Sequence, residues 1–393
     1  MATSGDQSSH RASAPAAEEP NGKGRAAVPV EYEYSTNLPA VLERLDLSLV
    51  LSTYQAGKLI TIGSHQGQLV FGFAGFPQVM GVSRTPTGLA IGSRETVWSL
   101  PASREIAPAL EPTAQHDVAF LTRQAHRTGA VLGHDLAYGD GQLWLVNTAF
   151  NCLCTLEPPW SFVPRWLPPF ITELAPGDRC HLNGLAMAEN WGGPAYVTAH
   201  GRTDSENGWR QSKANGGCLI DVVSSAVLAN DLSMPHSPRL HQGNLYLLNS
   251  GRGTLCRWDA DAGRITVIAR LPGFTRGLDC WGGHAAVGLS RIRESEVFGG
   301  LPVSEEHETL RCGVAIVNCS SGEQEAHLWF NSGVEEIYAL SLLPGVRNPI
   351  VIGPEPQLDS RETPWLVPPL RNLDTTTALA RAGRSNAPFP SRF

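Results

Sequence analysis

Histidine and other polar residues recur at the same position of a repeated sequence pattern. The pattern begins at His134, Asn183, His236 and Arg276, and again near Glu336. Neutral imidazole is a ligand that Fe, Zn and Cu accept in proteins, and an amide or carboxylate oxygen can complete such a coordination sphere. If the fold brings these positions together, they predict a site for a divalent transition metal (Fe, Zn or Cu). The predicted metal ligands are His134, His236, His181, Asn183 and Glu336.

A second group of polar residues is predicted to bind substrate beside this site. The planar guanidinium of Arg276 suits an anionic group of a small molecule, and the other members of the group are Asp135, Asn249 and Arg252. The competing interpretation is that all these side chains bond to backbone at strand starts and plug a channel. No HxxxH or HExxH spacing supports a metal, so both interpretations stay open. For Asn249 a role in the turn is favoured, because tight turns select Asn.

The repeat itself predicts which elements position these residues. The segments HDLAYGDGQLWLVNTAFNCLCTLE from His134 and HSPRLHQGNLYLLNSGRGTLCRWD from His236 match without a gap. Each is typical of three antiparallel strands joined by tight turns. Looser copies begin at residues 80, 183, 276 and about 336, at intervals of 40 to 60 residues. This period is typical of four-stranded propeller blades, whose inner strands begin around one end of a central channel.

We therefore predict an all-β chain with a single β-propeller over residues 35–355 and, as the favoured count, six blades. The last copy ends after its second strand, so the strands predicted over 47–63 and 68–76 are expected to complete that blade and close the ring. Seven blades stay open if residues 38–46 form a leading strand. A β-sandwich is the alternative fold, but it does not explain a repeat of this length.

Composition supports one turn-rich body with two looser ends. The 393 residues include 40 Gly and 29 Pro, and 42% are hydrophobic, which excludes a largely disordered chain. Residues 1–30 lack large apolar side chains and are predicted to be a disordered leader. Residues 356–393 are predicted to be a Pro-rich tail, partly packed on the body. Eight cysteines without a CxxC pair are expected to be buried thiols.

The same composition excludes several functions. The net charge is −7 with scattered Lys and Arg, so no nucleic acid partner is expected. No apolar run has the length of a membrane span or signal peptide, so we expect no membrane association and a cytoplasmic location. A nucleotide cofactor is not expected, because no GxGxxG or P-loop motif is present.

Several segments together resemble a bacterial family of conserved hypothetical proteins, a domain of unknown function of propeller type. They are STYQAGKL (52–59), GHDLAYGDGQLWLVNTAFNCL (133–153), HLNGLAM (181–187), MPHSPRLHQGNLYLLNSGRG (234–253) and FTRGLD (274–279). The resemblance covers roughly residues 35–355. It implies the fold and the choice of residues without naming a reaction.

The HLNGLA segment is more weakly similar to six-bladed gluconolactonase-like propellers, in which a PNGLA-like element supplies a metal-binding Asn. This similarity implies that Asn183 is a ligand. His134 and His236 stand where that family favours acidic or Asn oxygens, so a transition metal is expected rather than Ca²⁺.

Two functions follow from these residues. One is a metal-dependent enzyme that acts on a small anionic substrate, with the polar insertion at residues 200–219 as a candidate lid. The other is a non-catalytic propeller that binds a small ligand or a protein partner through its loops, with the polar residues as a structural plug.

Overall fold

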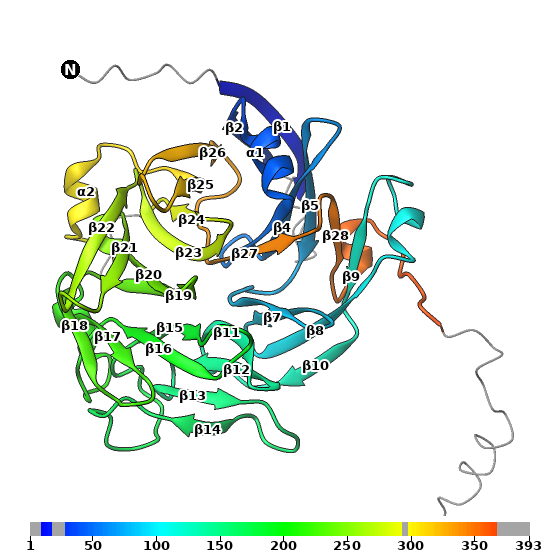
Figure 1. The fold of residues 1–393 in the computed structure, drawn as a ribbon. Helices are drawn as coiled ribbons and strands as arrows, with labels where there is room; N and C mark the ends of the chain where they lie inside the picture. Colours follow the sequence, from blue (N-terminus) through cyan, green and yellow to red (C-terminus); the bar gives the residue numbers. More distant parts are fainter. Residues whose placement is uncertain (1–8, 18–27, 293–297, 368–393) are drawn as a thin grey trace, which may run out of the picture. The chain divides into compact units, whose positions relative to one another are not determined.

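The computed structural model describes residues 9–17, 28–292 and 298–367 of the chain (Figure 1). It divides into two units, Met1–Arg361 and Glu362–Phe393. Every helix and strand described below belongs to the first unit. In the described ranges, no helix is long and apolar enough to cross a membrane.

Six sheets, antiparallel except for one strand pair, form a propeller in the first unit (Figure 1). Three of these sheets each consist of four strands that are consecutive in the sequence. They are β11 (Gly133–Gly139), β12 (Gln142–Asn147), β13 (Cys152–Thr155) and β14 (Val163–Trp166); β15 (Leu182–Met187), β16 (Pro194–Ala199), β17 (Gly217–Asp221) and β18 (Val227–Leu232); and β19 (Pro235–His241), β20 (Asn244–Asn249), β21 (Thr254–Asp259) and β22 (Arg264–Arg270).

The two sheets that carry extra strands follow the same plan. One contains β6 (Val82–Thr85), β7 (Gly88–Ser93), β8 (Thr96–Ser103), β9 (Val118–Leu121) and β10 (Gln124–Arg127), and β28 (Pro349–Ile352) pairs in parallel with β9. The other contains β23 (Phe274–Trp281), β24 (His284–Ser290), β25 (Cys312–Asn318) and β26 (Gln324–Phe330).

The sixth sheet closes the ring in the predicted way. Its inner strand is β27 (Ala339–Pro344), and it continues through β3 (Leu47–Thr53), β4 (Lys58–His65) and β5 (Gln68–Gly75). The six inner strands then contact one another in a circle, β6 to β11, β15, β19, β23, β27 and back to β6. Six blades and closure by N-terminal strands are therefore confirmed.

The seven-blade alternative is wrong, because residues 38–46 do not form a leading strand. Leu38–Leu45 is helix α1, which ends at Asp46 in a left-handed conformation. Leu38, Val41 and Leu42 share the buried face of this helix, the spacing of a helical rather than an extended segment. The segment packs against β3, β4 and β26.

The N-terminal residues differ from the predicted leader. Ser9–Ala17 is strand β1, which pairs with β2 (Val28–Ser35), and β2 in turn pairs with β26. The physical reason is backbone pairing: β2 hydrogen-bonds to the outer edge of β26, and β1 extends the same sheet by pairing with β2. Pairing of this kind needs no large side chains in β1, so composition did not reveal it. The rest of the predicted leader, residues 1–8 and 18–27, lies outside the described residues.

Short helices occupy several connections: α2 (Pro302–Glu306) and the 3₁₀ turns η1 (Ala107–Ala109), η2 (Gly208–Ser212), η3 (Ser250–Arg252) and η4 (Pro356–Asp359). In η4, Asp359 forms an ion pair with Lys58 of β4, with 2.8 Å between Oδ1 and Nζ. Residues 356–361 of the predicted tail are thus attached to the outside of the closing blade.

All eight cysteines are buried and unpaired, as predicted.

Candidate functional site

Four histidines come together where the inner strands begin. The ring centroids of His134 and His181 are 4.6 Å apart, those of His181 and His200 are 4.4 Å apart, and those of His200 and His236 are 4.8 Å apart. These four residues are the axial histidine cluster. They come from three neighbouring blades: β11, the two ends of the β15–β16 hairpin, and β19.

His134 and His236 are held in the same way, as their ungapped sequence match implies. Nδ1 of His134 lies 3.0 Å from the Leu132 carbonyl oxygen, and Nδ1 of His236 lies 2.9 Å from the Met234 carbonyl oxygen. A carbonyl only accepts, so each Nδ1 carries the proton and each Nε2 keeps a lone pair. A hydroxyl at the end of the next strand also contacts each Nδ1: Thr148 Oγ1 at 2.8 Å for His134, and Ser250 Oγ at 2.9 Å for His236.

The insertion at residues 200–219 packs on this cluster through Trp209. Its indole is 1% exposed and lies 4.3 Å from the His181 ring centroid. Trp209 Nε1 donates to Asp178 Oδ2 at 3.1 Å, and His181 Nδ1 donates to the same carboxylate at 2.9 Å. Asp178 therefore orients both Trp209 and one imidazole.

His200 has the fewest hydrogen bonds of the four imidazoles in the cluster. It is 1% exposed, and neither ring nitrogen has a hydrogen-bond partner within the described ranges. Asn183 is similar, because Thr198 Oγ1 donates to its Oδ1 at 2.7 Å while its Nδ2 is buried without a described partner. Buried polar atoms normally have partners, so these atoms mark a place suited to a polar ligand.

Arg276 and Glu336 lie beside the cluster. Arg276 Nη1 is 3.4 Å from Glu336 Oε1, and its guanidinium carbon lies 3.4 Å from the ring centroid of Tyr338. The Tyr338 ring is 5.4 Å from that of His134. Arg276 and Glu336 also line a cavity of about 240 Å³, here the axial cavity, together with Phe274, whose ring lies 5.6 Å from that of His236.

Burial determines the charge state of these groups. Desolvation lowers the pKa of His134, His200 and His236 well below the ordinary value, and the neighbouring His181 and the Arg276 charge lower it further. These three imidazoles are therefore uncharged at neutral pH. Burial has the opposite effect on Glu336 and raises the pKa of its carboxyl, against the influence of Arg276.

Comparison with protein families decides the identity of the chain. The model of a family described as a domain of unknown function, DUF4915, matches residues 36–352. The chain belongs to this family. The match spans the propeller and includes every predicted site residue, so the resemblance expected from the sequence is confirmed.

Several solved structures are similar to this DUF4915 chain at low identity. Virginiamycin B lyase from Staphylococcus aureus is 10% identical, with a TM-score of 0.38 over 62% of this chain and 73% of the other. A nidogen/laminin complex is 8% identical, with a TM-score of 0.44 over 76% and 98%. A streptogramin B lyase is 11% identical, with a TM-score of 0.38 over 71% and 74%. The search of curated proteins finds no match.

The DUF4915 chain brings together only part of the predicted site. His134, His181 and His236 meet in one cluster, and Arg276 and Glu336 adjoin it through Tyr338. Over the described ranges, however, no group of three or more His, Cys, Asp or Glu side chains is arranged to hold a metal ion. The imidazoles contact one another through their ring faces and edges, and the rings of His181 and His200 stack.

Three residues predicted to bind substrate have other roles or positions. Asp135 pairs with Arg239 of β19, at 3.0 Å between Oδ2 and Nη1. Asn249 Oδ1 accepts the Ser233 amide at 2.8 Å, the turn role that its sequence favoured. Arg252 is exposed in η3. Charge and spacing alone did not show that Asp135 has a partner more than a hundred residues away.

Two residues of this site were not among those predicted for it. His200 follows the second strand of its blade, where Ser, Thr and Asn also recur for turns, so the sequence did not separate it from them. Tyr338 lies in an apolar segment that reads as a strand. Their common signal is position, at the ends of strands that meet over the channel.

Proposed function

We propose that the axial histidine cluster and Arg276 bind a small molecule with an anionic group, and that the uncharged imidazoles accept hydrogen bonds from it. The observation that carries the proposal is the burial of three neutral imidazoles beside an arginine, with both ring nitrogens of His200 lacking a described partner. An enzyme that acts on a small anionic substrate is the function that this arrangement supports best.

Arg276 supplies the charge for binding. Its 3.4 Å contact with Glu336 is long for a charge-assisted hydrogen bond, which is usually about 2.7–2.9 Å. The guanidinium can therefore donate to a carboxylate of a ligand in the axial cavity. Because the pKa of Glu336 is raised by burial, this carboxyl can take up a proton when a second anion enters.

The imidazoles and Glu336 differ in the way that acid and base groups of enzymes do. His134 and His236 carry a proton on Nδ1 and present Nε2 as a proton acceptor. Burial raises the pKa of the Glu336 carboxyl toward neutral pH, whereas the lowered pKa of the imidazoles keeps them uncharged there and able to accept hydrogen bonds. In this site His134 or His236 would accept a hydrogen bond from the ligand through Nε2, and Glu336 would donate one once it has taken up a proton.

Calorimetric titration of the untagged full-length protein tests the binding step. The probes are acetate, succinate and inorganic phosphate at constant ionic strength, and the variants are Arg276→Gln and a control, Arg264→Gln, on the exposed strand β22. We expect saturable binding of a carboxylate that weakens at least tenfold in Arg276→Gln and is unchanged in Arg264→Gln. Equal affinity in Arg276→Gln, or no saturable binding of any probe, would refute the proposal.

A metal-bound form of the same cluster is the second candidate. It is favoured by the Nδ1 contacts of His134, His181 and His236 with two carbonyls and a carboxylate, which resemble the outer contacts of metal-binding histidines. Those three residues, with His200, would hold the ion. The test is the Fe, Zn and Cu content of the untagged protein and of a His134→Ala, His236→Ala variant. Stoichiometric metal that the variant loses supports this candidate, and its absence from both excludes it.

A further inference from the structure

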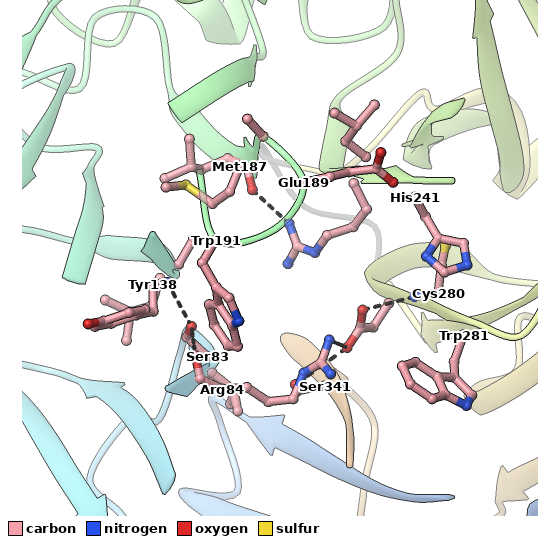
Figure 2. A pocket seen from close by; sticks show the side chains of 18 of the residues that line it. Ser83, Arg84, Tyr138, Met187, Glu189, Trp191, His241, Cys280, Trp281 and Ser341 are labelled. Atoms are coloured by element: carbon pink, nitrogen blue, oxygen red, sulfur yellow. Dashed lines mark hydrogen bonds and ion pairs between the residues drawn. The ribbon is translucent and has the colours of Figure 1, made fainter. Parts of the chain in front are cut away.

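A second cavity lies at the other end of the inner strands. Its volume is about 580 Å³, and each of the six inner strands contributes to its lining (Figure 2). The contributions of β15, β19 and β23 come from the second half of each strand. We call it the distal cavity. The axial histidine cluster is built from the beginnings of the same strands: His236 begins β19, for example, and His241 at its end lines the distal cavity.

Two ion pairs cross between blades at this cavity. Arg239 pairs with Asp135, and Arg84 pairs with Asp279 at 3.5 Å. Each aspartate also accepts a backbone amide of the next blade: Asp135 accepts that of Leu185 at 3.1 Å, and Asp279 accepts that of Leu342 at 2.9 Å. The charged groups are therefore fixed by the fold before any ligand binds.

This pairing excludes a charged ligand. Both guanidinium charges are already balanced by carboxylates, so the cavity has little attraction left for an anion. The same holds for a cation, because the Asp135 and Asp279 carboxylates already have arginine partners. Glu189 adds one more acceptor at the rim, where it accepts the Gly243 amide at 3.2 Å. The ligand expected here is uncharged and rich in hydrogen-bonding groups.

Two indole rings line the same cavity. Trp191 and Trp281 are 51% and 39% exposed although both are large and apolar. Figure 2 shows Trp191 projecting between Tyr138 and Arg84, with Trp281 across the cavity. The Tyr138 and Trp191 rings meet edge to face at 5.6 Å.

The backbone at Trp191, which places the indole in the cavity, has a strained conformation. Its φ is +60°, a left-handed conformation that bulky residues rarely adopt. The turn is held by neighbours, because the Asp140 amide donates to the Trp191 carbonyl oxygen at 2.7 Å. Glycine would adopt this conformation without strain, so a Trp191→Gly variant is compatible with the turn.

We infer that the distal cavity binds a neutral saccharide. A pyranose ring has an apolar C–H face that packs on an indole, and its hydroxyls both donate and accept hydrogen bonds. Adjacent hydroxyls match the spacing of a planar guanidinium and of a carboxylate, the two groups that Arg84 and Asp279 present together. The cavity volume is within the range of small-molecule sites.

Tryptophan fluorescence and calorimetry with named sugars test this inference. The probes are glucose, galactose, N-acetylglucosamine, maltose and cellobiose, with glucuronate and glucosamine as charged comparators. We expect saturable binding of at least one neutral sugar, tighter than that of its charged analogue. Binding of none of the neutral sugars, or tighter binding of a charged comparator, would overturn the inference.

Variants of Trp191 separate stacking from folding. Trp191→Gly keeps the turn and removes the indole, so it should fold with an unchanged or higher Tm and lose at least tenfold in sugar affinity. Trp191→Phe should keep most of the affinity. The control is Trp160→Ala, an indole that is 64% exposed outside both cavities and should not matter. Unchanged affinity in Trp191→Gly would contradict the proposal.

The two sites can fail independently. Arg276→Gln should leave sugar binding unchanged, since Arg276 lines only the axial cavity of the two. Trp191→Gly should leave carboxylate binding unchanged for the same reason.

Discussion

The guanidinium of Arg276, in β23, lies over the face of the Tyr338 ring, with 3.4 Å between its carbon and the ring centroid. Tyr338 belongs to the segment that leads into β27. The contact joins two neighbouring blades at the axial cavity and fixes the one arginine on which the proposed binding depends. Both side chains are buried, so the cation and the ring interact in a site largely removed from water.

Tyr338→Leu should weaken both this contact and anion binding. The desolvated cation–π contact is worth about 2 kcal/mol, and the lost ring volume adds to the effect on stability. We expect a lower Tm and a several-fold loss of carboxylate affinity, measured by calorimetry. Tyr338→Phe keeps the ring and should keep most of both. Full affinity in Tyr338→Leu would show that the ring does not position Arg276.

The stability of the protein should fall when the pH drops below about 6.5. The pKa values of His134, His200 and His236 are lowered in the folded state, so the unfolded chain binds more protons below the ordinary histidine pKa. Each residue then costs up to about 1.4 kcal/mol of unfolding free energy per pH unit until its folded pKa is reached. Urea denaturation at pH 7, 6 and 5 measures this slope.

A variant identifies the source of that slope. His200→Leu removes one buried imidazole and should flatten the pH dependence, whereas His10→Leu, which changes an exposed histidine, should not. An identical slope in His200→Leu and the unmodified protein would mean that the axial cluster does not control acid stability.

Trp209→Ala should destabilise the protein and open the axial site. The indole is fully buried against two histidines, and removing such a side chain typically costs about 3–5 kcal/mol. Trp209→Phe keeps most of the packing and loses only the bond to Asp178. Chemical denaturation gives the stability, and solvent exchange of the His181 ring proton reports access. A change under 1 kcal/mol in Trp209→Ala would show that the insertion is not part of the closed site.

Asp359→Asn should destabilise the closing blade. Lys58 and Asp359 are each 6% exposed, and breaking a buried pair leaves an uncompensated charge at a cost of about 3–5 kcal/mol. Replacing both residues in Lys58→Met, Asp359→Leu should recover most of that loss, since no buried charge remains. Denaturation of the two variants decides the matter. Equal losses in both would indicate that packing rather than charge is responsible.

The repeat in the sequence was sufficient to predict the fold. The ungapped match of the His134 and His236 segments indicated the strands, the turns between them and the residue that begins each inner strand. The incomplete last copy implied that N-terminal strands close the ring. Residues 38–46 were ambiguous because a short apolar segment fits a strand or a helix, and packing against β3 and β4 decided for the helix.

The site was predictable only where equivalent positions repeat. His134 and His236 were found because each begins an inner strand, whereas His200 ends a second strand and reads like a turn residue. The ion pair of Asp135 with Arg239 could not be predicted from the sequence, because Arg239 belongs to a blade two positions further along the chain. Contacts across the channel depend on the closed ring and leave no local spacing.

The most direct test of the axial site is nitrogen NMR of its imidazoles at pH 7, with and without succinate, in the unmodified protein and in Arg276→Gln. We predict that His134, His200 and His236 give resonances of neutral rings, and that succinate shifts those of His134 and His236 in the unmodified protein but not in Arg276→Gln. Charged imidazoles at pH 7, or equal shifts in both proteins, would contradict it.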